Sequence, residues 1–274
     1  MPARHPERIV CLTEETTETL YLLGEEHRIV GISGYTVRPP RARREKPRVS
    51  AFLSAKNDRI LELKPDLVIG FSDLQADIAR DLAKAGLNVV LFNQRSVQEI
   101  LDMILALSAL VGATGKGQRL IRRLEANLET IRNSAAGFPR KPRVYFEEWD
   151  APMISGIRWV SELVGIAGGE DVFSELSHSH SAAGRTIADA GEVVRRSPEV
   201  IIGSWCGKKF RPERVAARPG WEAIPAVRDH ELHEIKSSEI LQPGPAALTD
   251  GVRRIHEIVR GSLLRETRKP RQGA

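Results

Sequence analysis

Side chains that could bind a ligand or carry out chemistry follow several predicted strands at the point where each strand ends. Ligands of open parallel sheets collect beyond the carboxyl ends of the strands. The strand-end side chains are hydroxyl, carboxylate, aromatic and thiol groups: Thr13, Glu14, Tyr35, Phe71, Ser72, Trp149, Trp205 and Cys206. Phe52 and Trp159 fall in neighbouring loops. Because only 5% of the chain is aromatic, this concentration predicts an aromatic-lined cleft for a large, flat ligand.

Two histidines and one cysteine are the weak candidates for metal binding or covalent chemistry. His178 and His180 could bind a metal ion or cap a metal chelate from beneath, but no further ligand stands near them in the sequence. An ordinary surface loop is the competing interpretation. Cys206 has no histidine or acid at a readable spacing, which favours a packed or ligand-adjacent thiol over a nucleophile.

Two further motifs suggest catalysis or phosphate binding but do not meet the requirements. Glu147 and Glu148 are neighbours on a predicted strand, so their side chains point to opposite faces and do not form an acid–base pair. The segment Gly112–Gly117 resembles a phosphate-binding loop. The P-loop spacing fails, because Leu110 stands where the first glycine is needed and glycine, not Ser or Thr, follows Lys116.

The elements that must position these side chains alternate between short apolar strands and helices. Strands are predicted at 8–12, 29–33, 66–71, 89–92, 144–147, 197–203 and 232–236. Helices are predicted at 13–23, 57–63, 74–85, 96–110, 114–136, 159–167, 187–196 and 245–264. This alternation indicates β-α-β units and a mainly parallel sheet, and therefore an α/β fold with Rossmann-like lobes.

The longest predicted helix runs from Thr114 to Ala136. Its residues Leu120, Leu124, Leu128 and Ile131 recur at steps of four, four and three, which is typical of an amphipathic helix. About 20 helical residues span about 30 Å, the diameter of a small domain. We therefore expect this helix to join two lobes, with a surface helix of one continuous domain as the alternative.

An internal similarity supports two lobes. The segments Lys64–Gly70 and Ser197–Gly203 share the pattern of a proline, an acid and an apolar run, and they lie 133 residues apart. This offset is far longer than the period of about 20 to 50 residues in solenoids. We predict an N-terminal α/β lobe at 1–112, a connecting helix at 113–137 and a C-terminal α/β lobe at 138–274, with a disordered tail from about 266.

Composition restricts the class of protein. With 274 residues, 41% hydrophobic and 28% charged, the chain suits one large or two medium α/β domains. The net charge of +5 indicates acidic partners, anionic ligands or solubility, and does not by itself imply nucleic acid. The basic, proline-broken segment 34–48 holds one aromatic residue, Tyr35. It is therefore predicted to be a solvated connection rather than a nucleic-acid patch.

Membrane and redox signals are few. No apolar run reaches the length of a membrane span, and no hydrophobic leader precedes the first predicted strand. As written, the sequence predicts a cytoplasmic protein, with a mis-assigned start or a removed leader as the alternatives. Cys11 and Cys206 are too few for a disulfide framework and are expected to be free thiols.

Several segments together resemble the substrate-binding proteins of vitamin B12 and ferric-siderophore ABC importers. They occur in the family's order: Ile9–Thr13, Glu18 with Leu20, Val30–Ser33, Ile60–Ile69, Gly168–Phe173 and Ser197–Ile202. The segments most similar to a cobalamin-binding branch are Gly70–Gln75, Glu147–Asp150, Ile154–Gly156, Trp205–Gly207 and Pro243–Pro245. The resemblance covers residues 8–264. It implies two α/β lobes joined rigidly by a long helix, with the ligand in a cleft between the lobes.

The resemblance also implies ligand contacts in the N-terminal lobe. Phe52 falls where cobalamin-binding members carry a ligand-stacking tryptophan, and it keeps the stacking face without the indole donor. Tyr35 falls at a tyrosine near the corrin. Thr13 and Glu14 replace the usual serine-proline after the first strand, which implies a carboxylate beside the ligand.

In the C-terminal lobe the resemblance implies a changed pocket wall. Ser155 and Gly156 belong to a pocket loop. Arg185 lies near the position of a second stacking tryptophan and would make that wall cationic.

The family docks on its membrane transporter through one acidic residue on each lobe. Asp58 matches the first position. The second position falls at Gly191, with Glu192 and Asp189 as the nearest acids. An ABC transporter permease is therefore the implied partner, and a periplasmic location is implied with it.

These observations predict a non-enzymatic protein that binds a cobalamin-like corrinoid as the substrate-binding component of an ABC import system. No cofactor, resident metal or nucleic acid is required. A ferric siderophore or haem is the alternative ligand, since Arg185 would meet an anionic group. A cytoplasmic tetrapyrrole- or metal-handling enzyme or sensor is the alternative of another class, and its only pairing is Glu14 with His178 or His180.

Overall fold

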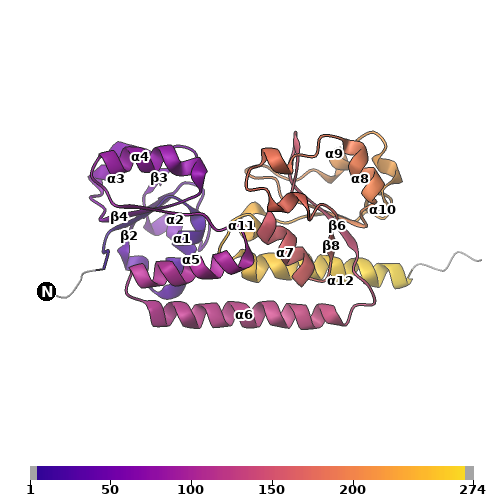
Figure 1. Ribbon diagram of the computed structural model, residues 1–274, viewed down its shortest axis with the longest axis horizontal. Coiled ribbons are helices and arrows are strands. Elements are labelled where there is room, and N and C mark those ends of the chain that lie inside the picture. The colour runs from indigo at the N-terminus through magenta and orange to yellow at the C-terminus, as the bar shows by residue number, and fades with distance from the viewer. Residues whose placement is uncertain (1–4, 269–274) are drawn as a thin grey trace, which may run out of the picture. The chain divides into compact units, whose positions relative to one another are not determined.

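The computed structural model describes residues 5–268, which contacts between residues divide into two compact units (Figure 1). Unit 1 contains the residues up to Gln94 together with Gln98–Glu125 and Gln242–Pro245. Unit 2 contains Arg95–Val97, Ala126–Leu241 and the residues from Ala246 onward. Each unit has its own sheet and its own apolar core.

Unit 1 is built on a five-stranded parallel sheet. The strands are β1 (Ile9–Cys11), β2 (Ile29–Ser33), β3 (Arg48–Ser50), β4 (Leu67–Phe71) and β5 (Val89–Phe92). Their order is β3-β2-β1-β4-β5, and all neighbouring pairs are parallel. Every residue of β1 and β4 is buried, as expected for the inner strands of a sheet covered on both faces.

Helices connect these strands. They are α1 (Glu14–Leu23), α2 (Ala42–Glu45), α3 (Asn57–Glu62), α4 (Ala76–Lys84) and α5 (Val97–Leu110). Helix α1 ends at Gly24, whose φ of 69° places it in the left-handed region that glycine adopts without a steric cost. The segment predicted to be a solvated connection in fact contains α2 and leads into β3. Both elements are too short to give a periodic signal.

Unit 2 has a mixed sheet. The strands are β6 (Arg143–Asp150), β7 (Met153–Ser155), β8 (Glu170–Asp171), β9 (Val200–Gly203) and β10 (Leu232–Glu234). The order is β10-β9-β6-β7, and β8 also pairs with β6. Only β7 is antiparallel. Strand β6 extends beyond the predicted residues 144–147 because β7 folds back on its second half.

The helices of unit 2 cover this sheet. They are α7 (Arg158–Ile166), α8 (Ala190–Arg196), α9 (Pro212–Ala216), α10 (Pro225–Arg228), α11 (Ser237–Ile240) and α12 (Val252–Arg268). A π-helical segment, Ala247–Gly251, precedes α12. Helix α8 begins later than the predicted position 187, because the side chain of Asp189 accepts a hydrogen bond from the Gly191 N–H and caps the helix.

The long helix is present as predicted. Helix α6 (Thr114–Ala136) is continuous and passes from unit 1 into unit 2 after Glu125. Within unit 1, Lys116 forms an ion pair of 2.7 Å with Glu25. Within unit 2, the Asn127 side chain donates to the Leu248 carbonyl at 2.8 Å. The four residues that gave the periodic signal are all buried: Leu120, Leu124, Leu128 and Ile131.

The internal similarity corresponds to a repeated structural device. Lys64 and Ser197, the residues before the two prolines, both have a positive φ, of 46° and 50°. In unit 1 the Asp66 carboxylate accepts the Glu7 and Arg8 N–H groups, which precede β1. In unit 2 the Glu199 carboxylate accepts the Arg143 N–H group, which begins β6. In both units, therefore, the acid after the proline fixes the start of the neighbouring strand.

The last described helix extends two residues beyond the expected start of the tail. Helix α12 runs to Arg268, past residue 266, where a disordered tail was expected to begin. The remaining residues, 269–274, lie outside the described range. Among residues 5–268 no helix is both long enough and apolar enough to cross a membrane.

Candidate ligand-binding site

The exit of β1 carries two buried carboxylates. Glu14 accepts the backbone N–H groups of Val37 and Arg38 at 3.0 and 2.8 Å, so it holds the loop after β2. Thr13 donates its hydroxyl to Glu15 at 2.5 Å. Burial raises the pKa of Glu14 and of Glu15 to about 7, more than these hydrogen bonds lower it. The predicted carboxylate at this strand end is present, and one of its oxygens is already bound to backbone.

The other strand exits of unit 1 carry aromatic side chains in different environments. Tyr35, after β2, is 60% exposed. Phe52, after β3, is half-buried, and Phe71, at the end of β4, is buried. The buried Gln75 ties the last two together, because its side chain accepts the Phe71 N–H at 3.0 Å and donates to the Phe52 carbonyl at 2.9 Å.

Ser72 has a structural role at the same edge of the sheet. It is buried, with a φ of 63°, and its hydroxyl accepts the Leu74 N–H at 3.3 Å. The hydroxyl therefore caps the 3₁₀ turn that leads into α4. Among the predicted site residues of unit 1, Tyr35 and Phe52 thus carry the accessible aromatic rings.

A fully buried carboxylate organises the strand exits of unit 2. Glu147 on β6 has no exposed surface. It receives two hydrogen bonds from the Arg218 guanidinium, at 2.5 and 3.0 Å. It also accepts the Tyr145 hydroxyl and the Trp205 indole N–H, both at 3.0 Å. The four donors satisfy both carboxylate oxygens, which is what a buried charge requires.

Glu148 has different partners from Glu147, and it lies where a bulge interrupts the pairing of β6 with β7. Its carboxylate forms a bidentate ion pair with Arg185, with the shorter contact at 2.5 Å. Arg185 is only 3% exposed and also donates to the Ser155 carbonyl at 2.6 Å. The cation expected in the pocket wall is therefore neutralised by its neighbour. The next residue after Ser155, Gly156, is tightly packed, because a Cβ atom there would lie 3.3 Å from the Phe146 side chain.

A lysine lies among the tryptophans at the ends of β6 and β9. The Lys208 amine is 4.0 Å from the ring centre of Trp149 and 5.0 Å from that of Trp205, within the range of cation–π attraction. It also pairs with the Asp150 carboxylate. Trp149 is half-buried and Trp205 is buried. This aromatic–cationic cluster, Trp149, Trp205 and Lys208, places the half-buried Trp149 ring beside a lysine whose charge is balanced by Asp150.

The remaining predicted site residues of unit 2 differ in accessibility. Cys206 is exposed, and partial desolvation together with the charge of Glu148 raises the pKa of its thiol. Trp159 is buried, and its indole N–H donates to the Ile240 carbonyl at 2.9 Å. His178 and His180 lie in and just after the 3₁₀ turn Leu176–His178. Within residues 5–268 no group of three His, Cys, Asp or Glu side chains is arranged to hold a metal ion.

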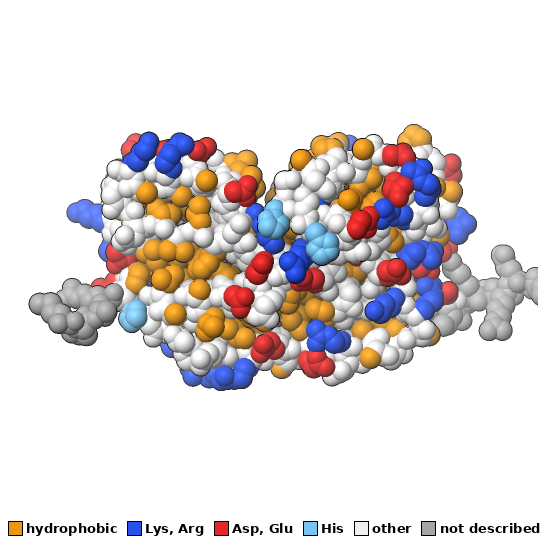
Figure 2. Space-filling model, viewed as in Figure 1, with side chains coloured by type: hydrophobic (Ala, Val, Ile, Leu, Met, Phe, Trp, Pro, Cys, Tyr) orange, Lys and Arg blue, Asp and Glu red, His pale blue; other side chains and the backbone are white. Residues whose placement is uncertain are grey.

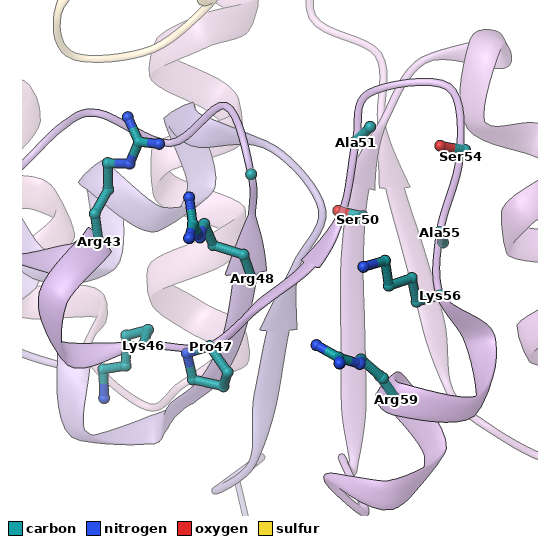
Figure 3. Close-up of a pocket in the computed structure, with 11 residues that line it drawn as sticks. Arg43, Lys46, Pro47, Arg48, Ser50, Ala51, Ser54, Ala55, Lys56 and Arg59 are labelled. Atoms are coloured by element: carbon teal, nitrogen blue, oxygen red, sulfur yellow. The ribbon is translucent and has the colours of Figure 1, made fainter.

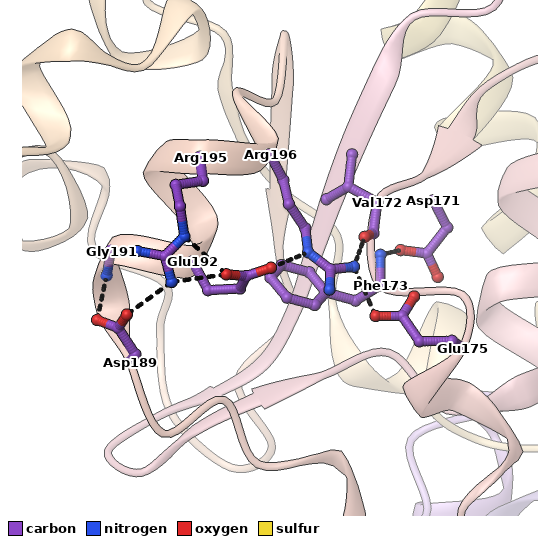
Figure 4. A network of polar contacts seen from close by, with 9 residues as sticks. All are labelled: Asp171, Val172, Phe173, Glu175, Asp189, Gly191, Glu192, Arg195 and Arg196. Atoms are coloured by element: carbon purple, nitrogen blue, oxygen red, sulfur yellow. Dashed lines mark hydrogen bonds and ion pairs between the residues drawn. The ribbon is translucent and has the colours of Figure 1, made fainter.

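The two candidate docking acids have different surroundings. Asp58 is exposed in the first turn of α3 and, among the described residues, forms no ion pair. Glu192 on α8 is bound on one carboxylate oxygen by Arg195 at 2.6 Å and on the other by Arg196 at 2.9 Å (Figure 4). Arg195 also pairs with Asp189 at 2.7 Å. Figure 2 shows the same mixing of acidic and basic side chains over the visible face of unit 2.

Two functional-site residues were missed in the sequence. Lys208 and Arg218 stand in loops of unit 2, 58 and 71 positions from their carboxylate partners Asp150 and Glu147. No local pattern links such distant residues. The only signal in the sequence was the position of Lys208 shortly after the strand-end Trp205.

Comparison with known proteins identifies the relatives of this architecture. The family profile described as periplasmic binding protein matches residues 9–239. A vitamin B12-binding protein of Vibrio parahaemolyticus is 27% identical over 248 residues, covering 88% of this chain and 86% of that protein. An uncharacterised ABC transporter substrate-binding lipoprotein of Bacillus subtilis is 24% identical, covering 96% of this chain and 83% of that protein.

A solved structure supports the same fold. A periplasmic haem-binding protein from Pseudomonas aeruginosa superposes with a TM-score of 0.78 and 18% identity, covering 94% of each chain. At this identity the likeness concerns the fold alone.

Proposed function

Because the chain belongs to the periplasmic binding protein family, we propose that it binds a cobalamin-like corrinoid without converting it, as the substrate-binding component of an ABC import system. The observation that carries the choice of ligand is the placement of accessible aromatic rings at strand exits. Tyr35 and Phe52 stand there in unit 1, and Trp149 stands there in unit 2. Flat rings suit the faces of a macrocycle. The similarity to a vitamin B12-binding protein over 88% of the chain supports the same ligand class.

The state of the strand-end carboxylates supports binding rather than catalysis. Glu147 is saturated by four donors, and one oxygen of Glu14 is engaged by two backbone N–H groups. A general acid or base must reach the proton that it transfers. In this proposal both carboxylates hold the loops and aromatic side chains in place, and the ligand leaves unchanged. No resident cofactor is required.

One observation favours haem as a second candidate. Lys208 stands beside the rings of Trp149 and Trp205, where it would exchange its Asp150 partner for a carboxylate substituent of a tetrapyrrole. Corrinoid and haem are distinguished by titrating the protein with cyanocobalamin, dicyanocobinamide, haemin and a ferric hydroxamate while following tryptophan quenching and ligand absorption. Saturation by the two corrinoids alone supports the proposal. Saturation by haemin alone replaces corrinoid with haem.

Variants test the placement of the site. Phe52→Ala and Trp149→Ala each remove one stacking ring and are expected to weaken binding about five- to twentyfold, which corresponds to about 1–2 kcal/mol. Phe138→Ala is the matched control, because this half-buried ring stacks on His256 at 5.2 Å within unit 2, away from the strand exits. If all three variants bind the ligand as tightly as the wild type, the Phe52 and Trp149 rings do not contact the ligand, and the proposed site is wrong.

The proposed partner is the permease of an importer, contacted through Asp58. Its exposed, unpaired carboxylate supports this role, whereas Glu192 would first have to leave two arginines. The role places the protein outside the cytoplasm, where an importer collects its substrate. In proteoliposomes holding the importer, Asp58→Lys should abolish the stimulation of ATP hydrolysis, and Glu62→Lys on the same helix should not. Normal stimulation by Asp58→Lys would argue against this contact.

A further inference from the structure

A cavity of about 640 Å³ lies beside the edge strand β3 of unit 1, and its lining is strongly basic. Figure 3 shows Arg43 and Arg48 on one side of the view and Lys56 and Arg59 on the other, with Lys56 and Arg59 extending toward its centre. Lys46 completes the set of cations. None of the lining side chains is acidic. The five cations come from α2, the approach to β3, and the start of α3, so the fold brings them together.

These five cations have no counterions in the structure. In the described part of the chain, none of them forms an ion pair, whereas arginines such as Arg185, Arg195 and Arg218 all do. Five like charges around one cavity repel one another, and an anion placed among them would relieve that repulsion. The cavity therefore favours a ligand with more than one negative charge.

A buried hydroxyl in the same cavity independently points to a ligand. Ser50, at the end of β3, is 8% exposed and lines the cavity. Its side-chain oxygen is buried and has no hydrogen-bond partner among the described residues. Buried polar atoms are normally satisfied, and an unsatisfied one needs an explanation. An oxygen-rich anion in the cavity would accept this hydroxyl.

The walls are held in place by backbone hydrogen bonds. The Ala51 N–H donates to the Ser54 carbonyl at 2.8 Å, and the Lys56 N–H donates to the Val49 carbonyl at 2.9 Å. The Gly34 N–H donates to the Ser50 carbonyl at 2.7 Å. The hydroxyl and the backbone that carries the cations are thus fixed before any ligand arrives, which lowers the ordering cost of binding.

We propose that this cavity is an anion site for a phosphoryl ligand carrying at least two negative charges, of the diphosphate class. Guanidinium and ammonium groups with a serine hydroxyl are donors suited to phosphoryl oxygens, which accept several hydrogen bonds each. A diphosphate presents more phosphoryl oxygens than a single inorganic phosphate to the five cations and the hydroxyl that line the cavity. The site lies beside the edge strand and borders the proposed macrocycle site, because its lining residues Gly34 and Ala51 are the chain neighbours of Tyr35 and Phe52.

Calorimetry with sodium pyrophosphate at low ionic strength tests the proposal. The wild type should bind one equivalent saturably, and Arg48→Gln/Lys56→Gln should weaken binding at least about tenfold, since each lost charge-assisted bond costs a factor of several. Arg44→Gln is the charge-matched control, because Arg44 is exposed on α2 but does not line the cavity. It should bind within about twofold of the wild type. Equal weakening in both variants, or no saturable binding, overturns the site.

The source of the phosphoryl group is distinguished by vesicle sedimentation. Cardiolipin vesicles, whose headgroup carries two phosphates, are compared with phosphatidylcholine vesicles, using the same variants. Binding of pyrophosphate without vesicle binding assigns a soluble ligand. Vesicle binding that the double variant loses and Arg44→Gln keeps assigns a lipid headgroup to the same site.

Ser50→Ala keeps the test independent of folding defects. Its hydroxyl has no partner in the unliganded protein, so the variant should unfold at the same or a higher denaturant concentration. Pyrophosphate affinity should nevertheless fall about two- to fivefold. A less stable Ser50→Ala protein, or one with unchanged affinity, would contradict the role assigned to this hydroxyl.

Discussion

Replacement of Arg218 by methionine tests how unit 2 holds its tryptophan at the strand exits. The change removes the guanidinium that makes two of the four hydrogen bonds to Glu147, at 2.5 and 3.0 Å. Glu147 has no exposed surface, so water cannot replace the lost donors. Breaking a buried ion pair from one side costs about 3–5 kcal/mol, because an uncompensated charge stays inside. We expect a loss of this size in the free energy of unfolding of unit 2.

Tryptophan fluorescence during urea denaturation measures this loss, because all four tryptophans of the chain belong to unit 2. Glu147→Gln/Arg218→Met removes both charges and should be more stable than Arg218→Met alone. Arg195→Met is the exposed control. Its pairs with Asp189 and Glu192 are solvated, so Arg195→Met should unfold close to the wild-type urea midpoint. A cost below about 1 kcal/mol for Arg218→Met would refute the assigned role of Glu147.

Two further predictions concern stability. Burial raises the pKa of Glu15 from 4.5 to about 7, so the folded state holds more protons than the unfolded state in that interval. Glu15 should therefore lower the stability of unit 1 by up to about 3 kcal/mol as pH rises from 4.5 through 7, and Glu14, whose pKa is also raised to about 7, acts in the same direction. Glu15→Gln should make the fall measured by hydrogen exchange in α1 shallower without abolishing it; an equally steep fall in the variant would contradict this cause. Gly203→Ala should destabilise unit 2 severely, because the new Cβ would lie 1.9 Å from Phe210. Gly165→Ala in α7 should stabilise unit 2 by about 0.5–1 kcal/mol, because the new Cβ would have no atom within 4 Å. Similar urea midpoints for the two variants would show that the packing argument fails.

The parts of the fold that follow from periodicity could be predicted. The α/β class, helix α6 at Thr114–Ala136 and the paired segments before β4 and β9 all leave regular apolar spacing in the sequence. Strands β3, β7 and β8 were not predicted, because each has only two or three residues and none lies in an apolar run like that of the equally short β1. Their positions depend on pairing with strands elsewhere in the same unit.

The sequence predicted the strand-end positions of the candidate site residues but not the residues that they contact. The strand-exit rule located Trp149 and Trp205, and the alternation of a strand separated Glu147 from Glu148. Their partners, Arg218 and Arg185, come from loops that the fold brings close. Long-range contacts of this kind leave no local signal. Segment 34–48 is a second example. It was predicted to be a solvated connection, and nothing local in the sequence shows that its cations line one cavity together with Lys56 and Arg59.

The most direct test of the proposed function is the stoichiometry and affinity of cyanocobalamin binding to the wild-type protein, measured by calorimetry. Our account predicts saturable binding of one corrinoid per chain with a submicromolar dissociation constant, weakened in Trp149→Ala and unchanged in Phe138→Ala. Absence of saturable heat at millimolar cyanocobalamin, with native fluorescence confirming folded protein, would contradict it.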